Sequence, residues 1–280
     1  MVTLKSLTQR VNGFGTMIEG EVTELFNSTT DEYADIQMES NEEKTRAYIL
    51  PHIKNLGAKT VLDMGCGVGT MVNSLVNEGF DAYGVDLITL GKYWEKQQLD
   101  KNRFFFVDPY TLELPFEDNS IDFVFTLGVI EHIGTSNGHS DRLANYHEIR
   151  KAWLREIFRV VKPGGHMLVG GPNRNFPFDT AHGPDSKASK LELKLTEIVG
   201  ATVHKPWGEN FLWGYSDTKL YMEGLPHEIQ PQSVKGLVYF SRVPVFFKRL
   251  VKMYVHHMPK LLLGSGFNPW MMVVIKKIKD

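Results

Sequence analysis

The stretch Val61-Leu62-Asp63-Met64-Gly65-Cys66-Gly67-Val68-Gly69-Thr70 decides the fold of this 280-residue chain. It begins as a short apolar run and ends in three alternating glycines, after which residues 71–76 regain helical character. Glycine has no Cβ atom, so such a turn can bend sharply and let a ligand approach the backbone. The amides at the start of the following helix can receive a carboxylate or a phosphate. The stretch therefore predicts a strand, a ligand-binding turn and a helix.

Strands and helices continue to alternate on both sides of this turn. A helical apolar stripe at 47–56 precedes it, with Ser40 and Glu43 spaced as a capping box. Further strands are predicted at 82–86, 103–107, 121–126, 166–170 and 270–275, the last of them antiparallel at the sheet edge. Helices are predicted at 89–99 and 141–161. Pro163-Gly164-Gly165 is expected to end the second of these helices. This alternation favours an α/β fold with a Rossmann-like, doubly wound, mostly parallel sheet.

Four regions follow from the pattern. Residues 1–40 lack sustained periodicity and are expected to form an N-terminal arm or cap, while 41–172 form the ligand-binding core. Residues 173–235 are rich in proline and in aromatic side chains, including Trp207, Phe211, Trp213, Tyr215 and Tyr221, which predicts a lid insertion over an apolar substrate, with core packing as the alternative. Residues 236–280 are expected to complete the core.

Acidic residues close three consecutive predicted strands, at Asp63, Asp86 and Asp108. Asp86 stands twenty-one residues after Gly65, where a carboxylate can accept hydrogen bonds from ribose hydroxyls. A nucleoside is therefore the expected ligand. The third glycine of a dinucleotide fingerprint would fall at position 70, which is Thr70 here, and this departure disfavours a nicotinamide or flavin dinucleotide.

Four segments together resemble the class I S-adenosylmethionine-dependent methyltransferases, in particular the branch with small-molecule acceptors. They are VLDMGCGVG at 61–69, GVDL at 84–87, VDPYTLELPFEDNSIDFVFTLGVIEHI at 107–133 and EIFRVVKPGGHMLVGGPN at 156–173, and the resemblance spans roughly 45–172. It implies S-adenosyl-L-methionine as cofactor and S-adenosyl-L-homocysteine as product. By position it also implies that Asp63, Gly65, Cys66, Gly67 and Gly69 hold the methionine moiety, Asp86 and Leu87 the ribose, and Asp108 and Pro109 the adenine, with Leu127 lining the opposite side.

Methyl transfer from a sulfonium is an in-line displacement, so the protein must position the acceptor and remove its proton. His132 follows the fourth strand and is the first candidate for a base or positioning group; alternatively, Glu131 and His132 order the cofactor pocket. Asp179 and His182 follow the carboxyl end of the fifth strand and form a second candidate pair, although Asp179 can equally organise a turn. No metal site is predicted, because the histidines and the acid between 132 and 147 are irregularly spaced.

Composition restricts the partners. Hydrophobic residues make up 42% of the chain, and 31 Lys and Arg against 33 Asp and Glu give a formal charge of −2, so no nucleic acid is expected as a partner. The single cysteine, Cys66, excludes an intrachain disulfide. The start of the sequence lacks the apolar region of a signal peptide and no run reaches about 18 apolar residues, which predicts a soluble cytoplasmic protein.

Residues 246–258 alternate apolar side chains with Lys248, Arg249 and Lys252, which is typical of a basic amphipathic helix. Such a helix can make peripheral contact with an anionic membrane or can pack on its own domain. A homo-oligomer, in which the N-terminal arm caps a neighbouring subunit, is also left open.

The sequence as a whole predicts a methyltransferase that acts on a small, hydrophobic or lipid-like metabolite. Two alternatives are a nicotinamide-dependent oxidoreductase, which the alternating strands and helices would suit, and a non-catalytic module that only binds a nucleoside.

Overall fold

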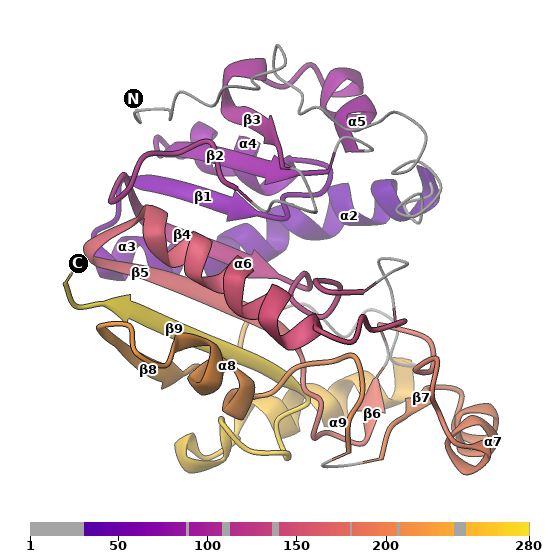
Figure 1. Ribbon diagram of the computed structural model, residues 1–280. Helices are drawn as coiled ribbons and strands as arrows, with labels where there is room; N and C mark the ends of the chain where they lie inside the picture. The colour runs from indigo at the N-terminus through magenta and orange to yellow at the C-terminus, as the bar shows by residue number, and fades with distance from the viewer. Residues whose placement is uncertain are drawn as a thin grey trace.

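The computed structural model describes residues 31–87, 90–107, 113–135, 140–179, 181–205, 208–237 and 245–279. Its centre is a seven-stranded sheet in the order β3-β2-β1-β4-β5-β9-β8 (Figure 1). The strands are β1 Thr60–Met64, β2 Asp81–Asp86, β3 Phe104–Phe106, β4 Ile121–Leu127, β5 Val161–Pro172, β8 His227–Pro231 and β9 Trp270–Lys277. Strands β1 to β5 pair in parallel and β9 runs antiparallel to both neighbours, which confirms the predicted Rossmann-like, mostly parallel sheet.

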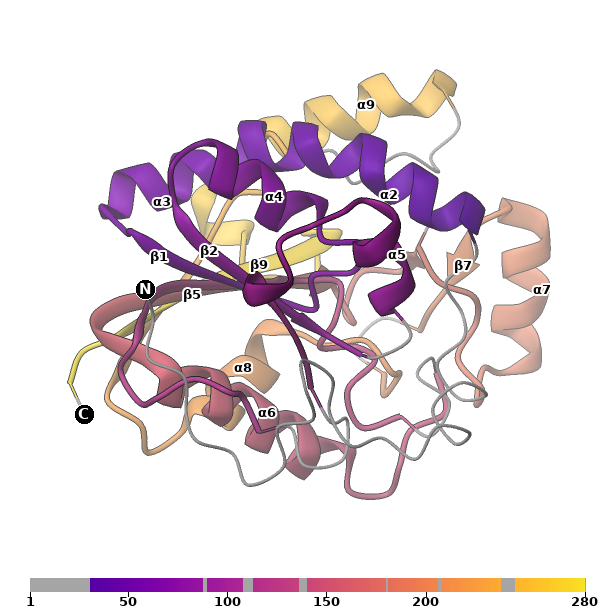
Figure 2. The same cartoon turned by 90° about the horizontal axis from the view of Figure 1, so that it is seen from above.

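Helices cover both faces of the sheet, as Figure 2 shows from above. One face carries α2 Asp31–Lys44, the π-helical turn Thr45–Ile49, α3 Leu50–Leu56, α4 Thr70–Asn77 and α9 Val245–His256. The other carries α6 Tyr146–Val160 and α8 Tyr215–Met222. Successive side chains of a strand point to opposite faces, so Val61 joins the core under the first group of helices and Leu62 the core under the second.

Smaller elements surround the carboxyl edge of the parallel strands. They are α5 Gly91–Lys96, α7 Lys190–Val199, the 3-10 turn Lys260–Leu262, and a second sheet of β6 Phe178–Asp179 with β7 Thr202–Val203. A further 3-10 turn, Lys101–Arg103, precedes β3 at the opposite, amino edge, where Arg103 contacts Asp81. In Figure 1 the arrowheads of β1 and β2 point to this edge. Loops that leave these strand ends therefore meet at one place.

The edge strand differs from the prediction. Strand β9 is antiparallel as expected but lies inside the sheet, because seven of its eight residues are buried and need a neighbour on each side. The outer position belongs to β8, whose polar sequence HEIQP is only half-buried. Residues 227–231 fall in the range predicted for the lid, so that range contributes a strand to the main sheet. Their lack of an apolar run is the reason that the pattern did not indicate a strand.

Several predicted helix ends were also wrong. Ser40 lies inside α2, where its hydroxyl donates to the Gln37 carbonyl at 3.4 Å instead of capping a helix. Helix α6 begins at Tyr146 rather than Asp141. It passes directly into β5 at Val161, so Pro163-Gly164-Gly165 forms an irregular start of that strand, next to a register shift against β4. Residues 1–30 of the predicted arm lie outside the described residues, and 31–40 are helical.

Candidate active site

The glycine turn connects β1 to α4 in a conformation that other residues rarely adopt. Gly65, Gly67 and Gly69 have φ angles of 86°, 54° and 84°, all in the left-handed region. A Cβ atom at Gly65 would approach Val129 Cγ2 to 2.3 Å, and one at Gly67 would lie 2.8 Å from Gln37 Oε1. The backbone conformation therefore favours glycine at all three positions, and at Gly65 the close Val129 side chain does so as well.

Two side chains of the α5 region hold the turn from outside. The indole N–H of Trp94 donates to the Gly67 carbonyl at 2.8 Å, and the Gln97 amide donates to the Val68 carbonyl at 2.7 Å. With both carbonyls engaged, the peptide planes of the turn are fixed. Sequence reasoning missed both residues, because they lie 27 and 29 positions further along the chain and nothing in their local pattern indicates this contact.

Asp86 at the end of β2 closes the turn from the neighbouring strand. Its Oδ2 accepts from the Gly67 N–H at 2.6 Å and its Oδ1 from the Leu87 N–H at 2.7 Å. Burial raises the pKa of Asp86 to about 6, and the two backbone donors only partly offset this effect. A carboxylate offers about four acceptor positions, so the half-buried Asp86 retains capacity for two ribose hydroxyls. The site thus fits a nucleoside cofactor.

Asp63 and Cys66 are buried beneath the turn. Burial raises the pKa of Asp63 well above its usual range, the Asp86 charge raises it further, and Lys44 lowers it. Burial likewise raises the pKa of the Cys66 thiol, so this group stays protonated and is unsuited to be a nucleophile. Leu87 and Leu127 are half-buried at the neighbouring strand ends. Asp108 and Pro109, predicted to contact adenine, lie outside the described residues.

A second group of polar residues follows β4 and β5 at the same edge. Glu131 is fully buried, and within the described part of the chain neither of its carboxylate oxygens has a hydrogen-bond partner. Its Oε1 lies 3.8 Å from His182 Nε2, and the rings of His132 and His182 are 5.1 Å apart. Burial raises the pKa of Glu131 to about 7 against the opposing effect of His182. The structure therefore brings together the candidates His132 and His182 from distant segments.

Asp179 makes both of the contacts that its sequence position allowed. Its Oδ1 accepts from the Ala181 N–H at 2.7 Å and organises a turn, while its Oδ2 lies 2.8 Å from His182 Nδ1. Burial opposes ionisation of Asp179, but hydrogen bonds with His182 and His204 outweigh it and hold the pKa of Asp179 well below its usual range. Asp179 is thus ionised and orients the His182 ring.

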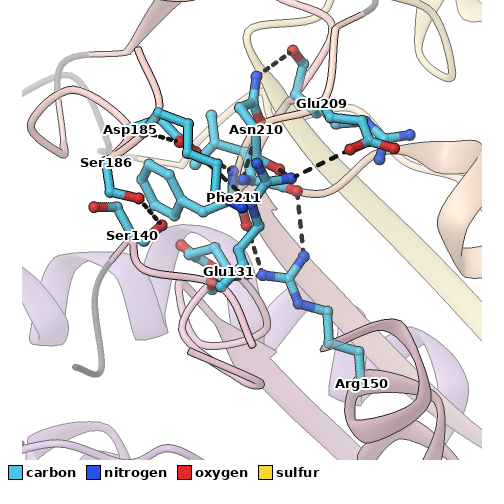
Figure 3. A network of polar contacts seen from close by, with 12 residues as sticks. Glu131, Ser140, Arg150, Asp185, Ser186, Glu209, Asn210 and Phe211 are labelled. Atoms are coloured by element: carbon cyan, nitrogen blue, oxygen red, sulfur yellow. Dashed lines mark hydrogen bonds and ion pairs between the residues drawn. The ribbon is translucent and has the colours of Figure 1, made fainter. Parts of the chain in front are cut away.

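Arg150 of α6 ties the loops of this group together (Figure 3). Its guanidinium is fully buried and donates to the carbonyls of Glu131 at 2.7 Å, Phe211 at 2.6 Å and Ile133 at 2.9 Å. The Phe211 N–H in turn donates to Asp185 at 2.9 Å. No sequence pattern indicated a role for Arg150, because its spacing places it among the apolar residues of an amphipathic helix.

The lid aromatics divide between the site and the core. Phe211 packs edge-on against His182, with ring centroids 5.4 Å apart. Trp213, Tyr221 and Met222 are fully buried in the core under α6 and α8, so packing accounts for them. Trp207 lies outside the described residues.

Glu131, His132 and His182 are also the residues that could hold a metal ion. One ligand atom from each lies within 4.8 Å of the others. Of the other histidines between positions 132 and 147, His139 lies outside the described residues. His147 Nδ1 instead lies 2.7 Å from the Tyr221 hydroxyl.

The fold and the glycine turn define a Rossmann-like protein with a nucleoside site at the carboxyl ends of its strands. Residues 62–169 match the family described as methyltransferase domain. Residues 62–169 therefore form a methyltransferase domain of the kind that uses S-adenosyl-L-methionine as its cofactor, as the resemblance to the class I enzymes implied. This assignment replaces the nicotinamide-dependent alternative.

Named relatives act on different atoms. The chain is 25% identical over 209 residues to phosphoethanolamine N-methyltransferase 1 of Triticum aestivum, covering 64% of this chain and 40% of the relative. It is 28% identical over 134 residues to a ubiquinone biosynthesis O-methyltransferase of Aliivibrio fischeri, covering 46% and 50%. Phosphoethanolamine N-methyltransferase 2 of Haemonchus contortus, solved in complex with S-adenosyl-L-methionine, has a TM-score of 0.47 at 18% identity, covering 89% of this chain and 58% of that one. The chain thus spans half or less of the length of these two curated relatives.

Proposed function

We propose that this chain transfers a methyl group to a small, hydrophobic or lipid-like metabolite, with His182 as the base that takes the acceptor's proton. The cofactor supplies a methyl group already activated on a sulfonium sulfur. The observation that carries the proposal is the Asp179–His182 contact of 2.8 Å beside the buried Glu131, at the edge that also holds the glycine turn.

The contact between His182 and Asp179 supports one direction of proton transfer. With Nδ1–H donating to the ionised Asp179, the lone pair of His182 is on Nε2. Nε2 would take the proton of the acceptor atom, and Asp179 would stabilise the imidazolium that results. The bound cofactor would supply the methyl group through cleavage of its methyl–sulfur bond and leave as S-adenosyl-L-homocysteine. Glu131, 3.8 Å from Nε2, can stabilise it further when ionised. His132 would position the acceptor beside this group.

Burial supports an apolar acceptor. Phe211 is fully buried against His182, and the ubiquinone-biosynthesis relative is named for a pathway whose product is hydrophobic. A hydroxyl proton is one that an imidazole can remove during transfer, so we propose an acceptor with a hydroxyl on an apolar or ring-bearing body.

The test has two stages. Calorimetric titration with S-adenosylhomocysteine measures cofactor binding, and incubation of labelled S-adenosylmethionine with a lysate metabolite extract measures transfer into organic-soluble product. Binding with labelled product is the expected result. Binding without transfer into any fraction would favour the non-catalytic nucleoside module, and label confined to water-soluble products would reject the apolar acceptor.

Treatment with EDTA is the control for the metal alternative. Under the proposal, turnover is unchanged by the chelator, because His182 acts as a base. Loss of turnover that a divalent cation restores would instead assign Glu131, His132 and His182 as metal ligands.

A further inference from the structure

The C-terminal part of this chain carries an excess of positive charge. From residue 229 to residue 279 the sequence holds nine Lys and Arg residues and no Asp or Glu, although the whole chain has a formal charge of −2. The positive field that is missing from the protein as a whole is therefore present on the elements built from this segment.

Helix α9 and the 3-10 turn that follows it expose apolar side chains within this basic segment. Leu250 is 51% exposed, Met253 55% and Leu261 82%. The exposed cations Arg249, Lys252 and Lys260 lie among them. We call these six residues the basic apolar face. Figure 2 shows α9 at the outside of its helical layer.

One side of the helix packs on the fold. Val255 is 4% exposed and joins the core under α2, α3 and α4, with the partly buried Val251 beside it. In a helix, residues 251 and 255 share one side, so Arg249 and Met253 lie on the opposite side. The outward surface therefore combines a cation with an apolar side chain.

The basic apolar face is joined to the loop that leads to the proposed base. The turn after it is held by Asn173, which is 2% exposed and donates to the carbonyls of Ser265 at 2.9 Å and Asn268 at 2.7 Å. Asn173 begins the segment from β5 to His182. The basic apolar face is thus connected to the carboxyl edge of the parallel strands, where the proposed base lies.

We propose that the basic apolar face docks on the surface of an anionic lipid bilayer; this rests on the proposed function in so far as the bilayer would supply a lipid-like acceptor. Apolar side chains ringed by cations suit the headgroup region of such a bilayer, where the cations meet lipid phosphates. Among the helices of the described ranges, none is long and apolar enough to cross a membrane.

Helix α7 also exposes apolar side chains and differs from α9 in its charge. Leu191 and Ile198 are 66% and 70% exposed, as apolar as anything on α9. The charges between them alternate, with Lys190 and Lys194 matched by Glu192 and Glu197. Exposed apolar area is common to both helices, and only α9 has an uncompensated positive charge. Helix α7 is therefore the matched control.

The experiment is flotation of the full chain with vesicles of phosphatidylcholine alone and with vesicles that contain 30% phosphatidylglycerol. We expect binding only to the anionic vesicles and its loss in high salt. The variant Arg249→Gln/Lys252→Gln should bind about 25-fold more weakly, since each cation near an anionic surface contributes about fivefold. Met253→Asn/Leu261→Asn should also bind more weakly, because it removes the apolar groups that enter the headgroup region.

The α7 variants Lys190→Gln/Lys194→Gln and Leu191→Asn/Ile198→Asn should float like the wild type. Equal flotation with both vesicle types, or equal loss in the α7 and α9 variants, would overturn the proposal. So would a shift in sedimentation mass in the α9 variants without a change in flotation, because the face would then cover a second copy of the chain. Titration with S-adenosylhomocysteine on each variant confirms folding and tests the enzyme separately, so that docking and methyl transfer can fail independently.

Discussion

Replacing Asp86 with Asn keeps the shape of the side chain and removes its charge. In the structure the two carboxylate oxygens accept from Gly67 N at 2.6 Å and Leu87 N at 2.7 Å. One oxygen becomes an NH₂ group, which cannot accept from either backbone donor or from a ribose hydroxyl. Hydrogen bonds to a charged group contribute about 1.5–3 kcal/mol, so Asp86→Asn should raise the dissociation constant of S-adenosylhomocysteine about 10- to 150-fold.

The same substitution should change the pH dependence of the stability of the protein without cofactor. Burial raises the pKa of Asp86 to about 6, so ionisation of this group reduces the stability of the folded state as pH rises from about 4 through 6. The neutral Asn avoids that loss. The free energy of unfolding of the variant relative to the wild type should therefore increase between pH 4 and pH 7, as followed by urea denaturation.

Calorimetry and urea denaturation of the wild type and of Asp86→Asn test the role of Asp86 in cofactor binding and in stability. A dissociation constant within twofold of the wild type, in a folded variant, would refute the ribose role of Asp86. A variant that becomes relatively less stable as pH rises from 4 to 7 would show that the two backbone hydrogen bonds outweigh burial, contrary to the direction of the pKa shift.

Three further substitutions test the rest of the site. His182→Ala should lower kcat about 100- to 10,000-fold in a radiolabel assay and leave S-adenosylhomocysteine binding intact; wild-type turnover would remove it as the base. Trp94→Phe deletes one neutral hydrogen bond to the Gly67 carbonyl and should raise the dissociation constant of S-adenosylhomocysteine about two- to tenfold, as measured by calorimetry. An unchanged dissociation constant would mean that the turn keeps its shape without this hydrogen bond. Arg150→Met leaves the carbonyls of two loops without donors and should lower the free energy of unfolding by about 3 kcal/mol or more in urea, whereas a loss below about 1 kcal/mol would mean that water replaces the guanidinium.

Local patterns were reliable wherever one short segment decides the outcome. The strand, glycine turn and helix at 61–76 form as predicted, because the φ angles of Gly65, Gly67 and Gly69 are properties of those residues. Helix ends were less predictable, because the N-terminus of α6 depends on contacts of the preceding loop that its own sequence does not record.

The sequence by itself determined the class of fold, the glycine turn and the position of Asp86, since each depends on residues close together in the chain. Only the tertiary structure decided that β8 takes the sheet edge, that Trp94 and Gln97 hold the turn, and that His182 meets Glu131. Glu131 and His182 are 51 residues apart and lie on different loops, so their distance depends on how β4 and β5 pair and on the buried Arg150 that joins the loops. The sequence contains the residues that form such a contact, but the contact itself depends on the packing of segments that are distant in the chain.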